Sequence, residues 1–194
     1  MKTISASRPL LWLVLALPGL WILCRWAAAP EVYGYGHAIG DSGDWSAWLL
    51  MLTLAVTPIR LLFRRRSWST WPMRRRRDFG VASFAYAASH AIIYIANKTS
   101  LDAILSDLAS PDILVGWLAL VLFVPLAATS NDIATRALKK SWKRLHRLVY
   151  PAAALSFLHW VLASFDPTTA YIHIATLAAI ELVRTGLQIR QRVT

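Results

Sequence analysis

The distribution of apolar residues is the most informative feature of this chain, because long apolar runs alternate with short polar segments. About 20 apolar residues in a helix that rises 1.5 Å per residue cross the ~30 Å hydrocarbon core of a bilayer. Six runs approach or exceed that length: residues 9–29, 45–63, 79–96, 113–129, 148–165 and 170–187. The pattern predicts an all-α integral membrane protein, a bundle of six transmembrane helices that forms a single domain over residues 1–194.

The charged residues divide between the two ends of the predicted helices. Of the 21 Lys and Arg residues, only Arg25 and Lys98 lie on the side of the loops that follow the first, third and fifth spans. Seven acidic residues gather in those same loops: Glu31, Asp41, Asp44, Asp102, Asp107, Asp112 and Asp166. Because Lys and Arg mark the cytoplasmic side of short loops, we expect both termini to be cytoplasmic. The net charge of +11 then serves contact with anionic membrane lipid, and a nucleic-acid partner is not expected.

The first apolar run has an alternative interpretation as a cleavable signal peptide. Lys2 and Arg8 precede it, and the small residues at 27–29 could form a cleavage site. The alternation of charge favours retention, because the C-terminus lies on the basic side only if this segment is the first of six spans.

The connection between the fourth and fifth spans has the pattern of a surface helix. Apolar residues recur near helical spacing over residues 131–145, and basic residues such as Arg136 and Lys140 occupy the other face. This pattern predicts an amphipathic helix on the cytoplasmic surface of the membrane. Contact with lipid is the simpler role, and docking of a reductase is the alternative.

Two histidines lie deep within predicted spans, where an ionisable side chain is costly enough to indicate function. His90 and His159 each lie about twelve residues from the cytoplasmic start of a span, so both imidazoles are expected about 18 Å deep. Two imidazoles at one level on facing helices are typical of the axial ligands of a b-type haem. No carboxylate is spaced to join them, which disfavours a zinc or di-iron site. The alternative is that each histidine makes an ordinary interhelical hydrogen bond.

His146 lies at the cytoplasmic entrance of the fifth span, thirteen residues before His159. At about 100° per residue, that separation places the two side chains on nearly opposite faces of an ideal helix. His146 is therefore either a ligand at a second, inner site or a residue among the lipid headgroups. His37 and His173 fall in or beside the opposite loops and are expected at the surface.

Several segments together resemble the ferric-reductase-like transmembrane haem proteins, and among them the members that serve periplasmic methionine sulfoxide reduction. The matching stretches run in the family's order over about half of the chain: LAVTPIR at 54–60, RRDFG at 76–80, Ser89-His90 with Tyr94, LAATS at 126–130, and WKRLHRLVY at 142–150 with His159. The last stretch is the most specific of them.

This resemblance implies a haem-b subunit in the inner membrane of a bacterium, with electron transfer rather than catalysis as its own task. Electrons would come from a cytoplasmic flavin reductase or the quinone pool and pass to a periplasmic molybdopterin enzyme that reduces methionine sulfoxide. By the resemblance, His90 and His159 are axial ligands of the iron of an outer haem, and His146 is a ligand on the inner side.

The inner site departs from the wider family, which has a further histidine on the third span where this chain has Arg76 and Arg77. The inner site is therefore expected to hold a weakly ligated second haem, a flavin such as FMN whose phosphate meets the arginines, or nothing. A stand-alone ferric or quinone reductase is the nearest alternative function. A transporter or an assembly scaffold with structural histidines is the alternative from another class.

Overall fold

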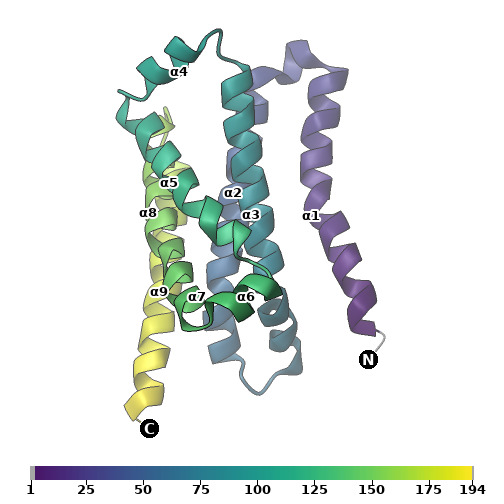
Figure 1. The fold of residues 1–194 in the computed structure, drawn as a ribbon, viewed down its shortest axis with the longest axis vertical. Coiled ribbons are helices and arrows are strands. Elements are labelled where there is room, and N and C mark those ends of the chain that lie inside the picture. Colours follow the sequence, from purple (N-terminus) through teal and green to yellow (C-terminus); the bar gives the residue numbers. More distant parts are fainter. Residues whose placement is uncertain (1–2, 194) are drawn as a thin grey trace.

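The computed structural model describes residues 3–193 of the chain and the side chains of residues 8–190. Helices make up nearly all of this part, and it contains no strand. Six long helices correspond to the six predicted spans: α1 (Thr3–Ala28), α2 (Pro30–Leu62), α3 (Thr70–Ala96), α5 (Pro111–Ala128), α8 (Val149–Ala163) and α9 (Thr168–Val193). The prediction of an all-α membrane bundle is confirmed, and this is a multi-pass membrane protein (Figure 1).

The fifth span is shorter than the sequence suggests. Five of the long helices have the length and the hydropathy needed to cross a membrane, whereas α8 has only 15 residues. At 1.5 Å per residue it rises only about 22 Å, which is less than the ~30 Å hydrocarbon core. The 3₁₀ turn η2 (His146–Leu148) directly precedes it and continues its path toward the basic end of the bundle.

The second and third helices extend beyond their apolar runs. Helix α2 begins at Pro30 rather than residue 45. It is broken at Gly34, whose φ of 49° is a conformation that glycine adopts readily. Helix α3 begins at Thr70 rather than residue 79, after the turn η1 (Ser67–Ser69). Arginine is a good helix former, so the run at residues 74–77 continues the helix instead of forming the connection. Hydropathy locates the part of a helix inside lipid, not the ends of the helix.

Short helices lie at both ends of the bundle. Helix α4 (Leu101–Asp107) lies at what we call the outer end, while α6 (Asp132–Leu138) and α7 (Lys140–Leu145) lie at the inner end (Figure 1). The single amphipathic helix expected over residues 131–145 is therefore replaced by two. The chain breaks at Lys139, whose φ of 46° is incompatible with a continuous helix.

The long helices pack in two groups. Helices α2 and α3 lie side by side, α5 lies against α8, and α9 packs along α2 and α8 (Figure 1). One buried cluster joins α1, α2 and α3: Ile22, Tyr33, Ala38, Leu49, Ala82, Tyr86 and Ile93. A second cluster joins α2, α5 and α8: Leu50, Leu54, Phe123, Leu126, Ala152, Ala153 and Phe157. The two functional histidines predicted from the sequence thus lie on helices of different groups.

Polar contacts tie the helices of the first group together. Asp78 on α3 is buried and accepts hydrogen bonds from Arg8 at 3.0 Å and from Trp12 at 3.2 Å, both on α1. Between α2 and α3, the hydroxyls of Ser46 and Ser83 each donate to the other residue's carbonyl, at 3.0 and 2.8 Å. In lipid these exchanged bonds satisfy polar groups that water cannot reach.

Helix α1 begins and α9 ends at the inner end, together with η1, α6 and α7 (Figure 1). The basic residues concentrate there, so we expect this end to face the cytoplasm. Reporter fusions at Ser67 and Lys140 should show cytoplasmic activity, and fusions at Ser106 and Asp166 should show periplasmic activity. A cytoplasmic signal at Ser106 would contradict six crossings, because α4 would then share a side with η1.

Candidate functional site

His90 on α3 and His159 on α8 meet near the outer end of the bundle. Their ring centres are 6.0 Å apart and their planes are at 84° to one another. Metal–imidazole bonds of about 2.0–2.1 Å, with a further ~1.2 Å from nitrogen to ring centre, place two rings on a shared metal roughly 6.4 Å apart. The two imidazoles lie beside each other, as expected of residues at one level, and their spacing is close to that of two rings on a shared metal.

The hydrogen bonds of both rings leave the same nitrogen available. Nδ1 of His90 lies 2.9 Å from the carbonyl oxygen of Ile39, and Nδ1 of His159 lies 2.7 Å from that of Asp112. A carbonyl only accepts, so Nδ1 carries the hydrogen and donates, and Nε2 keeps its lone pair. Metal-bound histidines usually have this arrangement, which sets the tautomer and the orientation of the ring.

The ligands around the pair indicate which metal group fits. No cluster of three or more His, Cys, Asp or Glu side chains able to hold a metal is found among the described residues. A zinc ion held by protein alone needs three or four such ligands. A haem iron takes its equatorial ligands from the porphyrin and needs only axial ones, as His90 and His159 could provide. The donor set therefore fits haem better than a bare metal ion.

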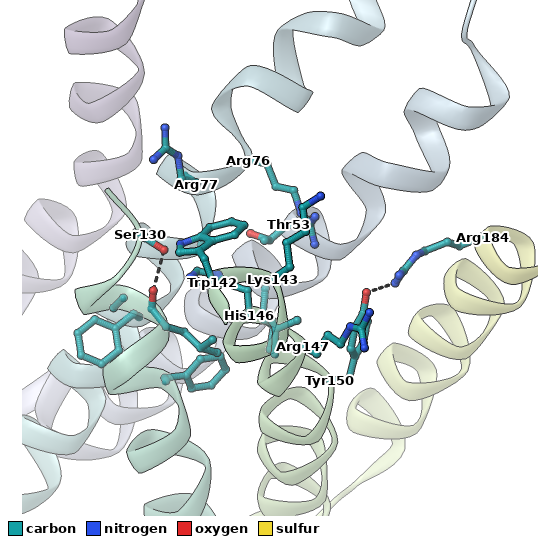
Figure 2. Close-up of a pocket in the computed structure, with 17 residues that line it drawn as sticks. Thr53, Arg76, Arg77, Ser130, Trp142, Lys143, His146, Arg147, Tyr150 and Arg184 are labelled. Carbon is teal, nitrogen blue, oxygen red and sulfur yellow. Dashed lines mark hydrogen bonds between the residues drawn. The ribbon is translucent and has the colours of Figure 1, made fainter. Parts of the chain in front are cut away.

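A cavity of about 380 Å³ lies at the inner end, between α2, α3, α5, α9 and the segment from α7 to α8. Figure 2 shows Arg76, Trp142 and His146 around it, with Tyr150 and Arg184 joined by a hydrogen bond at its side. Its volume is within the range of small-molecule sites. Its walls are partly apolar, with five Arg and Lys side chains among them: Arg76, Arg77, Lys143, Arg147 and Arg184.

The positive charges of this cavity are only partly neutralised. Arg77 pairs with Asp132, and Arg184 pairs with Glu181 at 2.8 Å. In the part of the chain that is described, Arg76, Lys143 and Arg147 form no ion pair; the Nε of Arg76 donates to the carbonyl of Thr53 at 3.0 Å. Because unpaired cations in a half-enclosed site attract anions, the cavity suits a ligand with a negative group and an apolar body.

His146 borders the cavity, and its hydrogen bonding differs from that of His90 and His159. Its Nε2 lies 3.0 Å from the hydroxyl of Thr129, and that hydroxyl donates to the carbonyl of Pro125 at 2.6 Å. Its ring stacks on Trp142, with ring centres 3.9 Å apart. Burial lowers the pKa of His146, and the charges of Arg76 and Arg77 lower it further. Because Thr129 already engages its Nε2, His146 is arranged as a wall residue of the cavity rather than as a metal ligand.

Some residues of these sites were not anticipated from the sequence. Tyr150 and Arg184 form one wall of the inner cavity, although they come from different helices. Glu181, three residues before Arg184, was a detectable signal, because a charged pair inside a span usually has a structural or functional role. His37 is exposed as expected, whereas His173 accepts a hydrogen bond from Trp48 at 3.0 Å and packs on Trp160.

Comparisons with known proteins agree on one family. Relatives named "Protein-methionine-sulfoxide reductase heme-binding subunit MsrQ" include those of Rhodospirillum rubrum, 41% identical over 77% of this chain and 73% of the relative, and Rhizobium meliloti, 37% identical over 75% and 73%. The Ralstonia nicotianae relative is 34% identical over 97% of this chain and 87% of its own. No solved structure matches significantly. The model of the family described as "Ferric reductase like transmembrane component" matches residues 42–157, more than half of the chain, and the chain belongs to that family.

Proposed function

We propose that this chain is the haem-binding membrane subunit of a methionine sulfoxide reductase system and carries electrons from the inner to the outer end of the bundle. The observation that carries the proposal is the pair of imidazoles 6.0 Å apart, each with Nε2 available. The names of the relatives supply the reaction that it serves.

His90 and His159 would hold the iron of a b-type haem from two sides. When bound, haem supplies a centre that accepts and releases one electron at a time. The protein contributes ligand orientation through the carbonyls of Ile39 and Asp112. Hydrogen bonds to the ligands help to set the reduction potential of such a centre.

The inner cavity is the proposed place where electrons enter. Its unpaired cations and partly apolar walls favour a flavin with a phosphate, such as FMN, and its volume also admits the head of a quinol. A cytoplasmic flavin reductase or the quinone pool would then be the donor. The engaged Nε2 of His146 favours a wall role here over ligation of a second haem.

The outer end is the proposed place where electrons leave, toward a periplasmic molybdopterin methionine sulfoxide reductase. Exposed carboxylates at this end include Glu31, Asp102 and Asp166, while Lys98 is paired with Asp107. An acidic surface attracts a partner with a basic patch and mainly accelerates encounter. This assignment places the protein in the bacterial inner membrane, with its inner end in the cytoplasm.

The decisive experiment follows haem reoxidation. We expect anaerobically reduced protein to be reoxidised only when a molybdopterin methionine sulfoxide reductase and methionine sulfoxide are both added. Because steered encounter weakens with ionic strength, the rate should fall by about tenfold or more at high salt. The variant Glu31→Gln/Asp102→Asn/Asp166→Asn should show a similar loss, whereas Asp132→Asn at the inner end should not.

A different outcome would favour the nearest alternative. If ferric iron alone reoxidises the haem as fast as the complete mixture, and the enzyme adds nothing, the protein is a stand-alone ferric reductase. If the protein contains no haem at all, the electron-transfer proposal fails and a scaffold or transporter with structural histidines takes its place.

A further inference from the structure

The two histidines of the outer site are held by the same local arrangement on two different helices. His90 bonds the carbonyl of Ile39 on α2, and Gly43 follows four residues later on that helix. His159 bonds the carbonyl of Asp112 on α5, and Gly116 follows four residues later. Each imidazole thus meets a carbonyl at position i and a glycine at position i+4 of its neighbouring helix.

Helix geometry explains why this spacing matters. A helical carbonyl at position i already accepts the N–H of residue i+4, and its second lone pair remains free. Every Cα–Cβ bond tilts toward the N-terminus of its helix, so a side chain at i+4 lies over the turn that contains the carbonyl of residue i. A residue without Cβ at i+4 leaves that carbonyl open to a ring from the neighbouring helix.

The available space supports this explanation at both positions. A Cβ on Gly116 would lie 2.9 Å from Nδ1, 3.0 Å from Cε1 and 3.2 Å from Cγ of His159. A Cβ on Gly43 would lie 3.2 Å from Nδ1 and 3.4 Å from Cε1 of His90. By contrast, a Cβ on Gly40, also on α2, would have no atom within 4 Å. The imidazoles occupy the volume that a side chain at Gly116 or Gly43 would need.

We propose that Gly43 and Gly116 are positioning residues of the haem site, each admitting one axial imidazole to the carbonyl that orients it. The inference rests on the proposed haem-binding function. Each group of helices then orients its own histidine: α2 orients His90 of α3, and α5 orients His159 of α8. The hydrogen bond from Nδ1 to a carbonyl makes the imidazole a stronger donor to a metal and sets its ring orientation.

The test replaces each glycine with alanine in the full-length, haem-loaded protein. In Gly116→Ala the ring of His159 must move, so its Nδ1 bond lengthens and its iron ligation weakens. We expect haem affinity to fall by about 10- to 100-fold, the range found for changes in groups that orient metal ligands. The reduction potential should rise, because a weaker imidazole donor stabilises ferric iron less, and the reduced haem should bind carbon monoxide.

The distances from each added Cβ to the imidazole also predict which alanine variant has the larger effect. Gly43→Ala should change the potential, the low-spin spectrum and carbon monoxide binding in the same direction but less, since its closest contact is 3.2 Å rather than 2.9 Å. Gly40→Ala is the matched control and should leave all three unchanged. If Gly116→Ala fails to fold, Gly43→Ala decides the question by the same measurements.

Two results would overturn the inference. One is wild-type haem affinity, potential and carbon monoxide reactivity in every glycine variant that folds. The other is an equal change in Gly40→Ala, which would indicate a general effect of alanine in the helix. The proposed function is judged separately by His90→Ala and His159→Ala: if these lose the low-spin haem while the glycine variants behave as wild type, only the inference on the glycines fails.

Discussion

Replacing His90 or His159 with alanine is expected to abolish the low-spin b-type spectrum of the purified protein. The two imidazoles lie against each other, and the described part of the chain contains no group of three or more His, Cys, Asp or Glu side chains that could hold a metal in their place. Loss of one ligand leaves a five-coordinate iron with weaker haem retention. Absorbance before and after dithionite, with haem content per chain, gives the measurement.

The matched control is His37→Ala, which removes an exposed histidine outside the pair. Its spectrum should be that of the wild-type protein. Membrane insertion of all three variants is checked by their yield and their elution as a single species in detergent. Should both His90→Ala and His159→Ala retain a normal low-spin spectrum, the assignment of these two ligands would be wrong.

Removing the charge of Arg76 is expected to slow electron entry strongly while the outer haem stays in place. Arg76 lines the inner cavity, and no carboxylate is paired with it among the described residues. A hydrogen bond to a charged group contributes about 1.5–3 kcal/mol, which corresponds to roughly 10- to 100-fold in the affinity for an anionic donor. The measurement is the rate of haem reduction by reduced FMN as its concentration is varied.

Arg74→Ala provides the control, because Arg74 belongs to the same arginine run but is exposed and lies outside the cavity. Reduced FMN should reduce the haem of this variant as fast as that of the wild-type protein. His146→Ala tests the neighbouring wall: reduction should slow while most of the haem is retained. Equal rates for Arg76→Ala and Arg74→Ala would place electron entry elsewhere, and loss of all haem in His146→Ala would make His146 a ligand or essential for folding.

The membrane architecture could be predicted from the sequence because the burial of apolar runs in the hydrocarbon core dominates its free energy. Burying an apolar run in hydrocarbon, with its backbone hydrogen bonds satisfied internally, allows only helices for such segments. Each predicted span accordingly has a helix in the structure, and the charge pattern is divided between two ends. The ends of α2 and α3 and the break at Lys139 were not predictable, since outside lipid the local sequence and neighbouring contacts decide where a helix stops.

Depth along a helix was also predictable, because it depends only on the rise per residue. For that reason the amino-acid sequence alone sufficed to pair His90 with His159. The sequence also indicated haem as the ligand of this pair, but it could not show which ring nitrogen is free: the free Nε2 depends on the carbonyls of Ile39 and Asp112 and on how two helix pairs approach each other. Tertiary contacts also distinguish His146 from this pair: Thr129 at the end of α5 bonds its Nε2, and Trp142 on α7 stacks on its ring.

The sequence by itself determined the all-helical membrane architecture, the basic and acidic ends, and the two histidines at one level. Only the tertiary structure decided the inner cavity, which combines residues from five separate parts of the chain, including Arg76 and Arg184. It also decided that Gly43 and Gly116 lie against imidazoles while Gly40 faces open space. Hydropathy and rise per residue act along one helix, whereas these features depend on the rotation of each helix about its axis, which only packing against the other helices sets.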